Sequence, residues 1–201
     1  MWTFEQNAQK KGYVSIAGID EVGRGPLAGP VVSAAVILGN SFSVSGITDS
    51  KQLSPRKRDD LYSQIYQDAQ SISLGMVDND IIDQINILQA ARRSMLYAVE
   101  KLQIQPDFLL IDGIHKIESG IPQETIKKGD QRSISIAAAS IVAKVTRDRM
   151  MINYAATYPE YGFEQHKGYG TKKHLDAIKK YGICPIHRRT FKGCAEYASK
   201  R

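Results

Sequence analysis

The sequence predicts an α/β fold in which helices pack on a mixed β-sheet, and three features of the 201-residue chain support this prediction. Two apolar, β-prone segments at 13–20 and 30–38 are joined by a stretch rich in Gly and Pro, which is typical of a hairpin-like pair. Helical and strand patterns then alternate along the chain. A hydrophobic content of 42% and a charged content of 24% are ordinary for one globular domain of this size. We therefore expect a single domain over 1–201, with a basic helical C-terminal portion over about 150–201.

The elements after the first two strands follow from capping residues and apolar spacing. Ser54 and Pro55 offer an N-cap and a proline at the first helical position, which predicts a helix to about residue 70. A final helix should end before Gly182, with Thr171 as its N-cap. The other expected elements are strands over 71–77, 107–111 and, more weakly, 124–128, and helices over 80–103 and about 133–157.

Basic residues are concentrated in the last third of the chain. Residues 141–201 hold 13 Lys and Arg against 5 Asp and Glu, a net charge of +8, whereas 1–140 hold 14 against 16, a net charge of −2. Nucleic acid would bind such a surface, and an ordinary solvated basic surface explains the same pattern. The chain shows neither a secretory signal nor an apolar span, so we expect a cytoplasmic protein with no membrane partner. Cys184 and Cys194 are expected to be free thiols.

Carboxylates stand at the ends of predicted strands in three places. Asp20 and Glu21 end the first strand, Asp112 ends the apolar run "FLLID", and Asp130 lies between a weak strand and a helix. Any one of them could simply form a turn or cap a helix. If the strand of Asp112 lies beside that of Asp20, however, these acids meet at one sheet edge, where binding sites of α/β folds gather.

Clustered carboxylates need cations or raised pKa values, because like charges about 4 Å apart repel by roughly 4 kcal/mol at an effective dielectric constant of 20. An all-oxygen ligand set favours Mg²⁺ or Mn²⁺ over zinc. Adjacent residues of a regular strand point to opposite faces, so Asp20 and Glu21 share a site only if the strand ends or bulges there. The following segment "GRGPLAG" lacks phosphate-loop spacing and is either a turn that needs glycine or a place where backbone approaches a ligand.

Taken together, these motifs resemble bacterial ribonuclease HII over nearly the whole chain. The motifs that carry the resemblance are "GIDEVGRGPLAGPVV" (18–32), "DSKQLS" (49–54), "INILQA" (85–90), "LLIDG" (109–113), "KGD" (128–130), "AASIVAKVTRDRMM" (138–151), "YGFEQHKGYGT" (161–171) and "HRRTF" (187–191). Gln52 departs from the family pattern, which more often has a second lysine there, and we interpret it as a change in phosphate contact.

The resemblance implies an RNase H-like mixed five-stranded sheet flanked by helices, with a helical C-terminal extension. It also implies an endonuclease that cuts the RNA strand of RNA–DNA hybrids and cuts 5′ of ribonucleotides embedded in duplex DNA. The catalytic and metal-binding acids of the family transfer onto Asp20, Glu21, Asp112 and Asp130. Two divalent ions, Mg²⁺ or Mn²⁺, would then serve phosphodiester hydrolysis without a side-chain nucleophile.

The substrate contacts implied by the family are the Gly23-Arg24-Gly25 backbone at the ribonucleotide sugar and Tyr169 at the RNA–DNA junction. Exposed N–H and C=O groups of the glycine turn could read the 2′-OH as both donor and acceptor. Candidates for phosphate contacts are Lys51, Lys144, Arg147 and Arg188, although Lys144 and Arg147 could equally form an ordinary solvated helix face.

Other functions remain open at this point. One alternative is a different two-metal RNase H-like nuclease of DNA junctions, another is a non-catalytic nucleic-acid-binding relative, and a third is a structural metal-binding domain. The retained acids argue against the second, and the basic C-terminal portion against the third. We expect a monomer without an obligate protein partner, and histidines with structural or surface roles.

Overall fold

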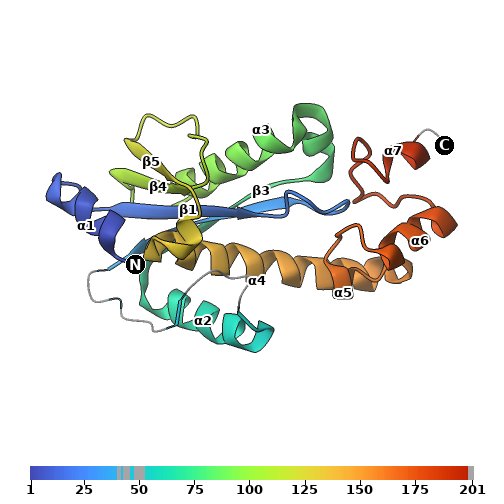
Figure 1. Ribbon diagram of the computed structural model, residues 1–201, viewed down its shortest axis with the longest axis horizontal. Coiled ribbons are helices and arrows are strands. Elements are labelled where there is room, and N and C mark those ends of the chain that lie inside the picture. Colours follow the sequence, from blue (N-terminus) through green and yellow to red (C-terminus); the bar gives the residue numbers. More distant parts are fainter. Residues whose placement is uncertain (40–41, 43–45, 48–52, 199–201) are drawn as a thin grey trace.

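A five-stranded sheet with helices on both faces forms the body of the protein, as the sequence predicts (Figure 1). The computed structural model describes residues 1–39, 42, 46–47 and 53–198. The strands are β1 (Ile16–Val22), β2 (Val31–Leu38), β3 (Ala69–Val77), β4 (Phe108–Asp112) and β5 (Gln123–Ile126). The helices are α1 (Thr3–Lys10), α2 (Pro55–Asp68), α3 (Asn79–Glu100), α4 (Ile134–Thr157), α5 (Phe163–His166), α6 (Lys172–Tyr181) and α7 (Ala195–Ala198), with 3-10 turns η1 (Gly129–Gln131) and η2 (Pro159–Tyr161).

The strand order is β3-β2-β1-β4-β5, which makes the sheet mixed. The first three strands pair antiparallel, and β4 joins β1 in parallel with Ile19 opposite Ile111. β5 continues the parallel part beside β4. This order places the end of β4 directly beside the end of β1. The strand that ends in Asp112 is therefore the neighbour of the strand that carries Asp20.

The two long helices cover opposite faces of the sheet and meet different side chains of β1. Ala17 and Ile19 pack in a core cluster with Met95 and Val99 of α3. Gly18 faces α4 so closely that a Cβ there would lie 2.1 Å from the Ser135 carbonyl carbon. β1 therefore alternates between the α3 face and the α4 face up to its acidic end.

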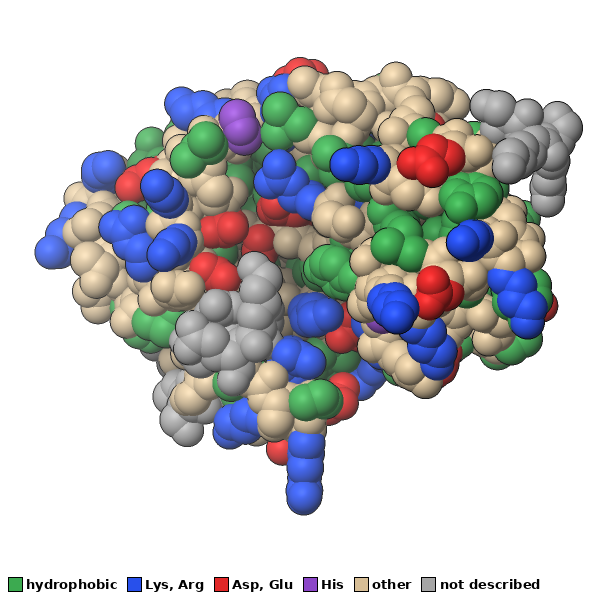
Figure 2. Space-filling model, turned by 45° about the vertical axis from the view of Figure 1, so that its right-hand side comes forward, with side chains coloured by type: hydrophobic (Ala, Val, Ile, Leu, Met, Phe, Trp, Pro, Cys, Tyr) green, Lys and Arg blue, Asp and Glu red, His purple; other side chains and the backbone are tan. Residues whose placement is uncertain are grey.

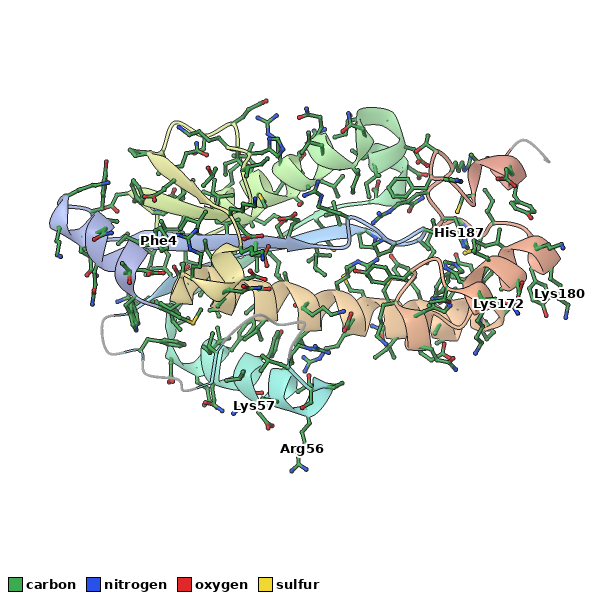
Figure 3. The ribbon with its side chains drawn as sticks, viewed as in Figure 1. Phe4, Arg56, Lys57, Lys172, Lys180 and His187 are labelled. Carbon is green, nitrogen blue, oxygen red and sulfur yellow. The ribbon has the colours of Figure 1, made fainter. Side chains whose placement is uncertain are left out.

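The C-terminal helices pack against the far end of α4 and the loop between β1 and β2 (Figure 1). Leu27 and Ala28 of that loop share a core cluster with Met151, Phe163 and Ile178. Figure 3 shows Lys172 and Lys180 projecting outward from α6. Among the described residues, no helix combines the length and the apolar character that crossing a bilayer demands.

The structure differs from the predicted elements mainly inside the 80–103 helix and at the N-terminus. Asn86 has a φ of +66° and interrupts α3, because its side-chain Oδ1 accepts hydrogen bonds from the amides of Leu88 and Gln89 and starts a new helical turn. Helix α1 was not expected. Its buried Glu5 accepts hydrogen bonds from Ser133 and Ser135 at the start of α4, and so ties the N-terminus to the fold.

Candidate active site

Three carboxylates converge where β1 and β4 end side by side. Asp20 follows the Ile19–Ile111 pair, and Asp112 is the last residue of β4. One ligand oxygen from each of Asp20, Glu21 and Asp112 lies within 4.8 Å of the others. The sequence predicted that these acids come together if their strands are neighbours, and the structure confirms this. Figure 2 shows acidic side chains gathered in a hollow of the surface, with Lys and Arg side chains around it.

Asp20 and Glu21 share this site without a bulge in β1. The pairing of β1 with β2 stays regular through Glu21–Ser33 and Val22–Val32. By alternation, Asp20 lies on the α4 face and Glu21 on the α3 face. Both carboxylates reach the same place because β4 ends at Asp112 and, in the part of the chain that the structure describes, no strand pairs with this edge of β1 beyond Ile19. Of the two expected possibilities, a strand end is the one present, because β1 ends at Val22, one residue beyond Glu21, and its pairing with β4 stops at Ile19.

Burial and mutual repulsion raise the pKa of the two β1 acids. Asp20 is 6% exposed, and desolvation followed by the charges of Glu21 and Asp112 holds its pKa well above the usual range. Desolvation also raises the pKa of Glu21, and the nearby Arg24 guanidinium partly offsets this. The Arg24 Nη1 lies 3.2 Å from Glu21 Oε1. Among the described residues, this is the ion pair made by a carboxylate of the cluster. The site thus holds more negative charge than its protein neighbours balance.

The donor set suits a hard divalent cation. All three side chains offer carboxylate oxygens, which Mg²⁺ and Mn²⁺ prefer over softer ligands. The Gly129 amide donates to Asp112 Oδ1 at 2.6 Å and fixes one oxygen of that carboxylate. A pocket of about 200 Å³ lies against Glu21 and Asp112 and is also lined by Arg24, Arg92 and His115.

Asp130 is near this cluster but is not one of its three close members. It lies in η1, is 7% exposed, and directly follows Gly129, whose amide contacts Asp112. The group of mutually close ligand atoms contains Asp20, Glu21 and Asp112 alone among the described residues. The structure therefore brings three of the four predicted acids together. Asp130 lies outside this group, next to the residue that contacts Asp112.

The glycine turn passes beside the carboxylates and carries the expected positive φ. Gly23 has a φ of +99°, and a Cβ there would lie 2.3 Å from Arg147 Nε, so only glycine fits. A Cβ built on Gly25 would lie 3.6 Å from the Tyr169 ring, which is 43% exposed. The structure thus brings the ring of Tyr169 to the glycine turn, two features that 144 positions separate in the sequence.

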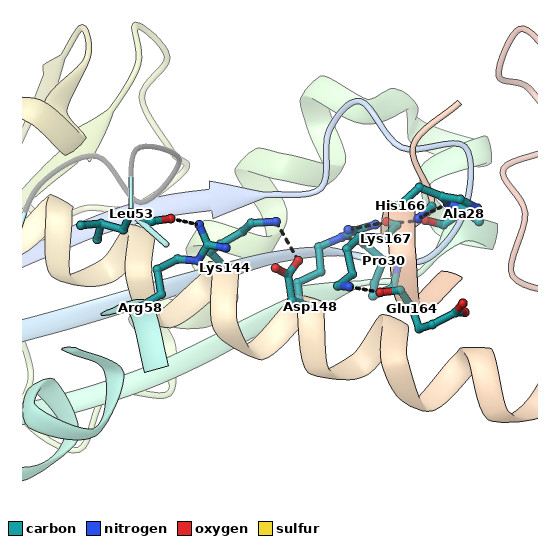
Figure 4. Close-up of polar contacts among 11 residues, drawn as sticks. Ala28, Pro30, Leu53, Arg58, Lys144, Asp148, Glu164, His166 and Lys167 are labelled. Atoms are coloured by element: carbon teal, nitrogen blue, oxygen red, sulfur yellow. Dashed lines mark hydrogen bonds and ion pairs between the residues drawn. The ribbon is translucent and has the colours of Figure 1, made fainter. Parts of the chain in front are cut away.

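Arg147 and Arg188 do not lie where phosphate could reach them, so their predicted role as phosphate contacts needs correction. Both side chains are fully buried. The guanidinium of Arg147 donates to carbonyl oxygens of Ala28, Pro30 and Lys167, three residues that are labelled in Figure 4. That of Arg188 donates to the carbonyls of Gly23, Arg24 and Gly29 in the loop between β1 and β2. The sequence signal failed because an arginine in a basic segment looks the same whether it is buried or solvated.

Lys144 and Lys51 have different outcomes. Lys144 forms an ion pair with Asp148 at 2.7 Å and lines a groove of about 550 Å³ between α2 and α4, together with Arg58 and Lys167 (Figure 4). Phosphate contact by Lys144 would have to compete with Asp148. Lys51 and Gln52 lie outside the described residues.

Sequence reasoning missed two supporting groups. Ser140 hydrogen-bonds to Asp20 and lowers its pKa against the larger effects of burial and repulsion. The sequence feature that could have indicated this role is a single hydroxyl side chain in the alanine-rich start of α4. His174 and His187, which share no motif, are joined by their Nε2 atoms at 3.0 Å, and His174 Nδ1 lies 2.9 Å from the Tyr169 carbonyl. Figure 3 places His187 beside the end of the β1–β2 loop, where it pairs with Ala28.

Comparisons with known proteins agree with this site and this fold. Residues 17–194 match the family model described as Ribonuclease HII. A ribonuclease HII of Geobacter metallireducens is 55% identical over 199 residues, which cover 99% of this chain and 93% of that protein. The Enterococcus faecalis ribonuclease HII is 58% identical over 95% of this chain and 74% of its own length. The crystal structure of ribonuclease H2 from Pyrococcus horikoshii superimposes with a TM-score of 0.77 at 27% identity, covering 93% of this chain and 98% of that one. The chain therefore belongs to the ribonuclease HII family of endoribonucleases.

Proposed function

We propose that this protein cuts 5′ of single ribonucleotides embedded in duplex DNA, and cuts the RNA strand of RNA–DNA hybrids, with two divalent cations. The observation that carries the proposal is the convergence of Asp20, Glu21 and Asp112 directly beside the glycine turn. One part of the site is suited to hydrolysis and the other to inspection of the adjacent sugar.

The acidic part of the site would hold Mg²⁺ or Mn²⁺. Two such ions would supply charge neutralisation at the scissile phosphate, orientation of the attacking water and stabilisation of the leaving oxygen. Asp20, Glu21 and Asp112 are proposed as ligands because their oxygens already lie within 4.8 Å of one another. We propose Asp130 as the fourth ligand, because its neighbour Gly129 contacts Asp112 and a second ion needs further oxygen donors.

The other part of the site would select a ribonucleotide. The 2′-OH is the group by which a protein distinguishes RNA from DNA at a given position. Gly25 has no side chain between its backbone and the solvent, and the exposed Tyr169 ring next to it can pack on a neighbouring sugar. Arg24 is half exposed and is anchored by Glu21, so the turn and the carboxylates are joined by a direct contact.

A cleavage assay with controlled cations tests this proposal. Labelled RNA–DNA hybrid and a duplex with one ribonucleotide are incubated with the protein in Mg²⁺, in Mn²⁺ and in excess chelator. We expect cutting of both substrates with either ion, and none with the chelator. Cutting that persists at full rate in excess chelator would contradict the metal assignment. Absence of cutting of both substrates in both ions would contradict the proposed activity.

A further inference from the structure

Two buried arginines lie beneath the glycine turn, and neither has a carboxylate partner within ion-pair distance among the described residues. Each guanidinium instead donates to main-chain carbonyls. Arg188 binds the carbonyls of Gly23, Arg24 and Gly29. Arg147 binds those of Ala28, Pro30 and Lys167. Burying two such charges is unfavourable unless their hydrogen bonds are satisfied, and here backbone oxygens satisfy them.

The bonds of Arg188 determine which way two peptide groups face. The chain contains no cis peptide in its described part, and in a trans peptide the C=O and the following N–H point in opposite directions. The carbonyls of Gly23 and Arg24 point inward to Arg188. The amides of the same two peptide groups, which belong to Arg24 and Gly25, therefore point away from the buried guanidinium.

These two amides are available to a ligand. Arg24 and Gly25 are exposed, whereas Gly23 and the following Pro26 are buried. Within the described residues no hydrogen bond is made by either amide. Because each carbonyl accepts from a charged donor, its peptide group is polarised and its N–H becomes a stronger donor. The turn thus presents two adjacent donors, while the carbonyls of Gly23 and Arg24 are engaged by Arg188.

We propose that Arg188 is a positioning residue for ribonucleotide recognition: it holds the glycine turn with carbonyls inward and amides outward, so that the Arg24 and Gly25 amides donate to the 2′ oxygen. This inference rests on the proposed function. The 2′ oxygen is then recognised as an acceptor, and a sugar with hydrogen at that position leaves two polarised donors without a partner.

Arg147 provides a matched control within the same structure. It is equally buried, bears the same charge and donates three hydrogen bonds to carbonyls. None of these carbonyls belongs to the peptide groups of the Arg24 and Gly25 amides. Replacement of either arginine by lysine should weaken the packing of the turn, but only the change at Arg188 frees these two peptide groups.

The test compares binding selectivity in the variants Arg188→Lys and Arg147→Lys. Affinities for a one-ribonucleotide duplex and for the matched all-DNA duplex are measured with Ca²⁺ in place of the reactive ion, and thermal unfolding is followed in parallel. We expect Arg188→Lys to reduce the preference for the ribonucleotide duplex about tenfold, the effect of one to two hydrogen bonds. Arg147→Lys should retain the preference even where it lowers the melting temperature.

An unchanged preference in folded Arg188→Lys, or an equal loss in both variants, would overturn the inference. A wild-type protein with no preference would instead contradict the proposed function, so the two failures are distinguishable. Should Arg188→Lys not fold, NMR of the ¹⁵N-labelled wild-type protein decides the question. The Arg24 and Gly25 amide protons should shift downfield with the ribonucleotide duplex and not with the all-DNA duplex, and the absence of this difference would count against the inference.

Discussion

Replacement of Asp112 by Asn is expected to abolish cutting while making the metal-free protein more stable. Asp112 Oδ1 accepts the Gly129 amide at 2.6 Å, and the carbonyl oxygen of Asn can accept the same bond. The substitution therefore removes charge and little else. It takes one carboxylate away from Asp20 and Glu21, whose ligand oxygens lie within 4.8 Å of it.

The size of the effect follows from this geometry. At 4.8 Å and an effective dielectric constant of 20, each pair of ionised carboxylates repels by roughly 3.5 kcal/mol. Partial protonation of Asp20 and counterions reduce this repulsion, because burial and the neighbouring charges already raise the pKa of Asp20. We therefore expect a net gain of about 1–2 kcal/mol in the free energy of unfolding. Loss of a metal ligand should lower the cutting rate about a thousandfold.

Urea unfolding in chelator and single-turnover cutting in Mg²⁺ measure the two effects. Asp107→Asn is a matched control at the opposite end of β4, where both carboxylate oxygens accept hydrogen bonds from the amides of Val14 and Ser15. It should lower stability by about 1 kcal/mol and leave cutting intact. A cutting rate near wild type, or a loss of stability in Asp112→Asn, would refute the assignment of these acids to one repulsive metal site.

Three further predictions concern the surroundings of the site. Glu5→Ala should lower the free energy of unfolding by about 2–3 kcal/mol in urea titrations, because two serine hydroxyls and one backbone amide lose the carboxylate to which they donate. Glu5→Gln should restore part of this stability. Burial lowers the pKa of His174 and His187 to about 4, below their unfolded value near 6.5, so stability should be complete above pH 6.5 and fall as the pH drops toward 4. Since each of the two histidines has this shift, unfolding at pH 5 should cost about 3–4 kcal/mol less than at pH 7, and equal values would contradict the neutral pair. Tyr169→Ala should weaken cutting at a lone ribonucleotide about tenfold while leaving affinity for plain duplex unchanged, and an equal loss in both would make it a general packing residue.

The strands and the main helices could be predicted from the sequence because capping residues, apolar spacing and β-prone runs each lie within a short stretch of the chain. The helix from Lys172 to Tyr181 has its N-cap, its basic last turn and its closing glycine within a dozen residues, and it forms as expected. The break at Asn86 could not be foreseen, because a helical apolar spacing runs through it and the left-handed residue is stabilised by its own side chain. Helix α1 lacks a capping side chain and is held by Glu5, a contact across 128 positions.

The site shows the same division between local and long-range information. The acids of β1 and β4 were identifiable as strand-end residues, and only the pairing of Ile19 with Ile111 places them together. The burial of Arg147 and Arg188 depends on packing between α4, the C-terminal segment and the glycine turn. Residues next to them in the sequence therefore do not indicate that they are buried. The histidine pair joins residues of different segments in the same way.

One comparison tests most directly the claim that hydrolysis and sugar recognition are joined in this site. Two labelled duplexes that differ by a single oxygen atom, one with a ribonucleotide and one with the corresponding deoxynucleotide, are incubated with the wild-type protein and Mg²⁺. We expect one cut on the 5′ side of the ribonucleotide and no cut in the all-DNA duplex. Cutting of both duplexes at the same rate would contradict this claim.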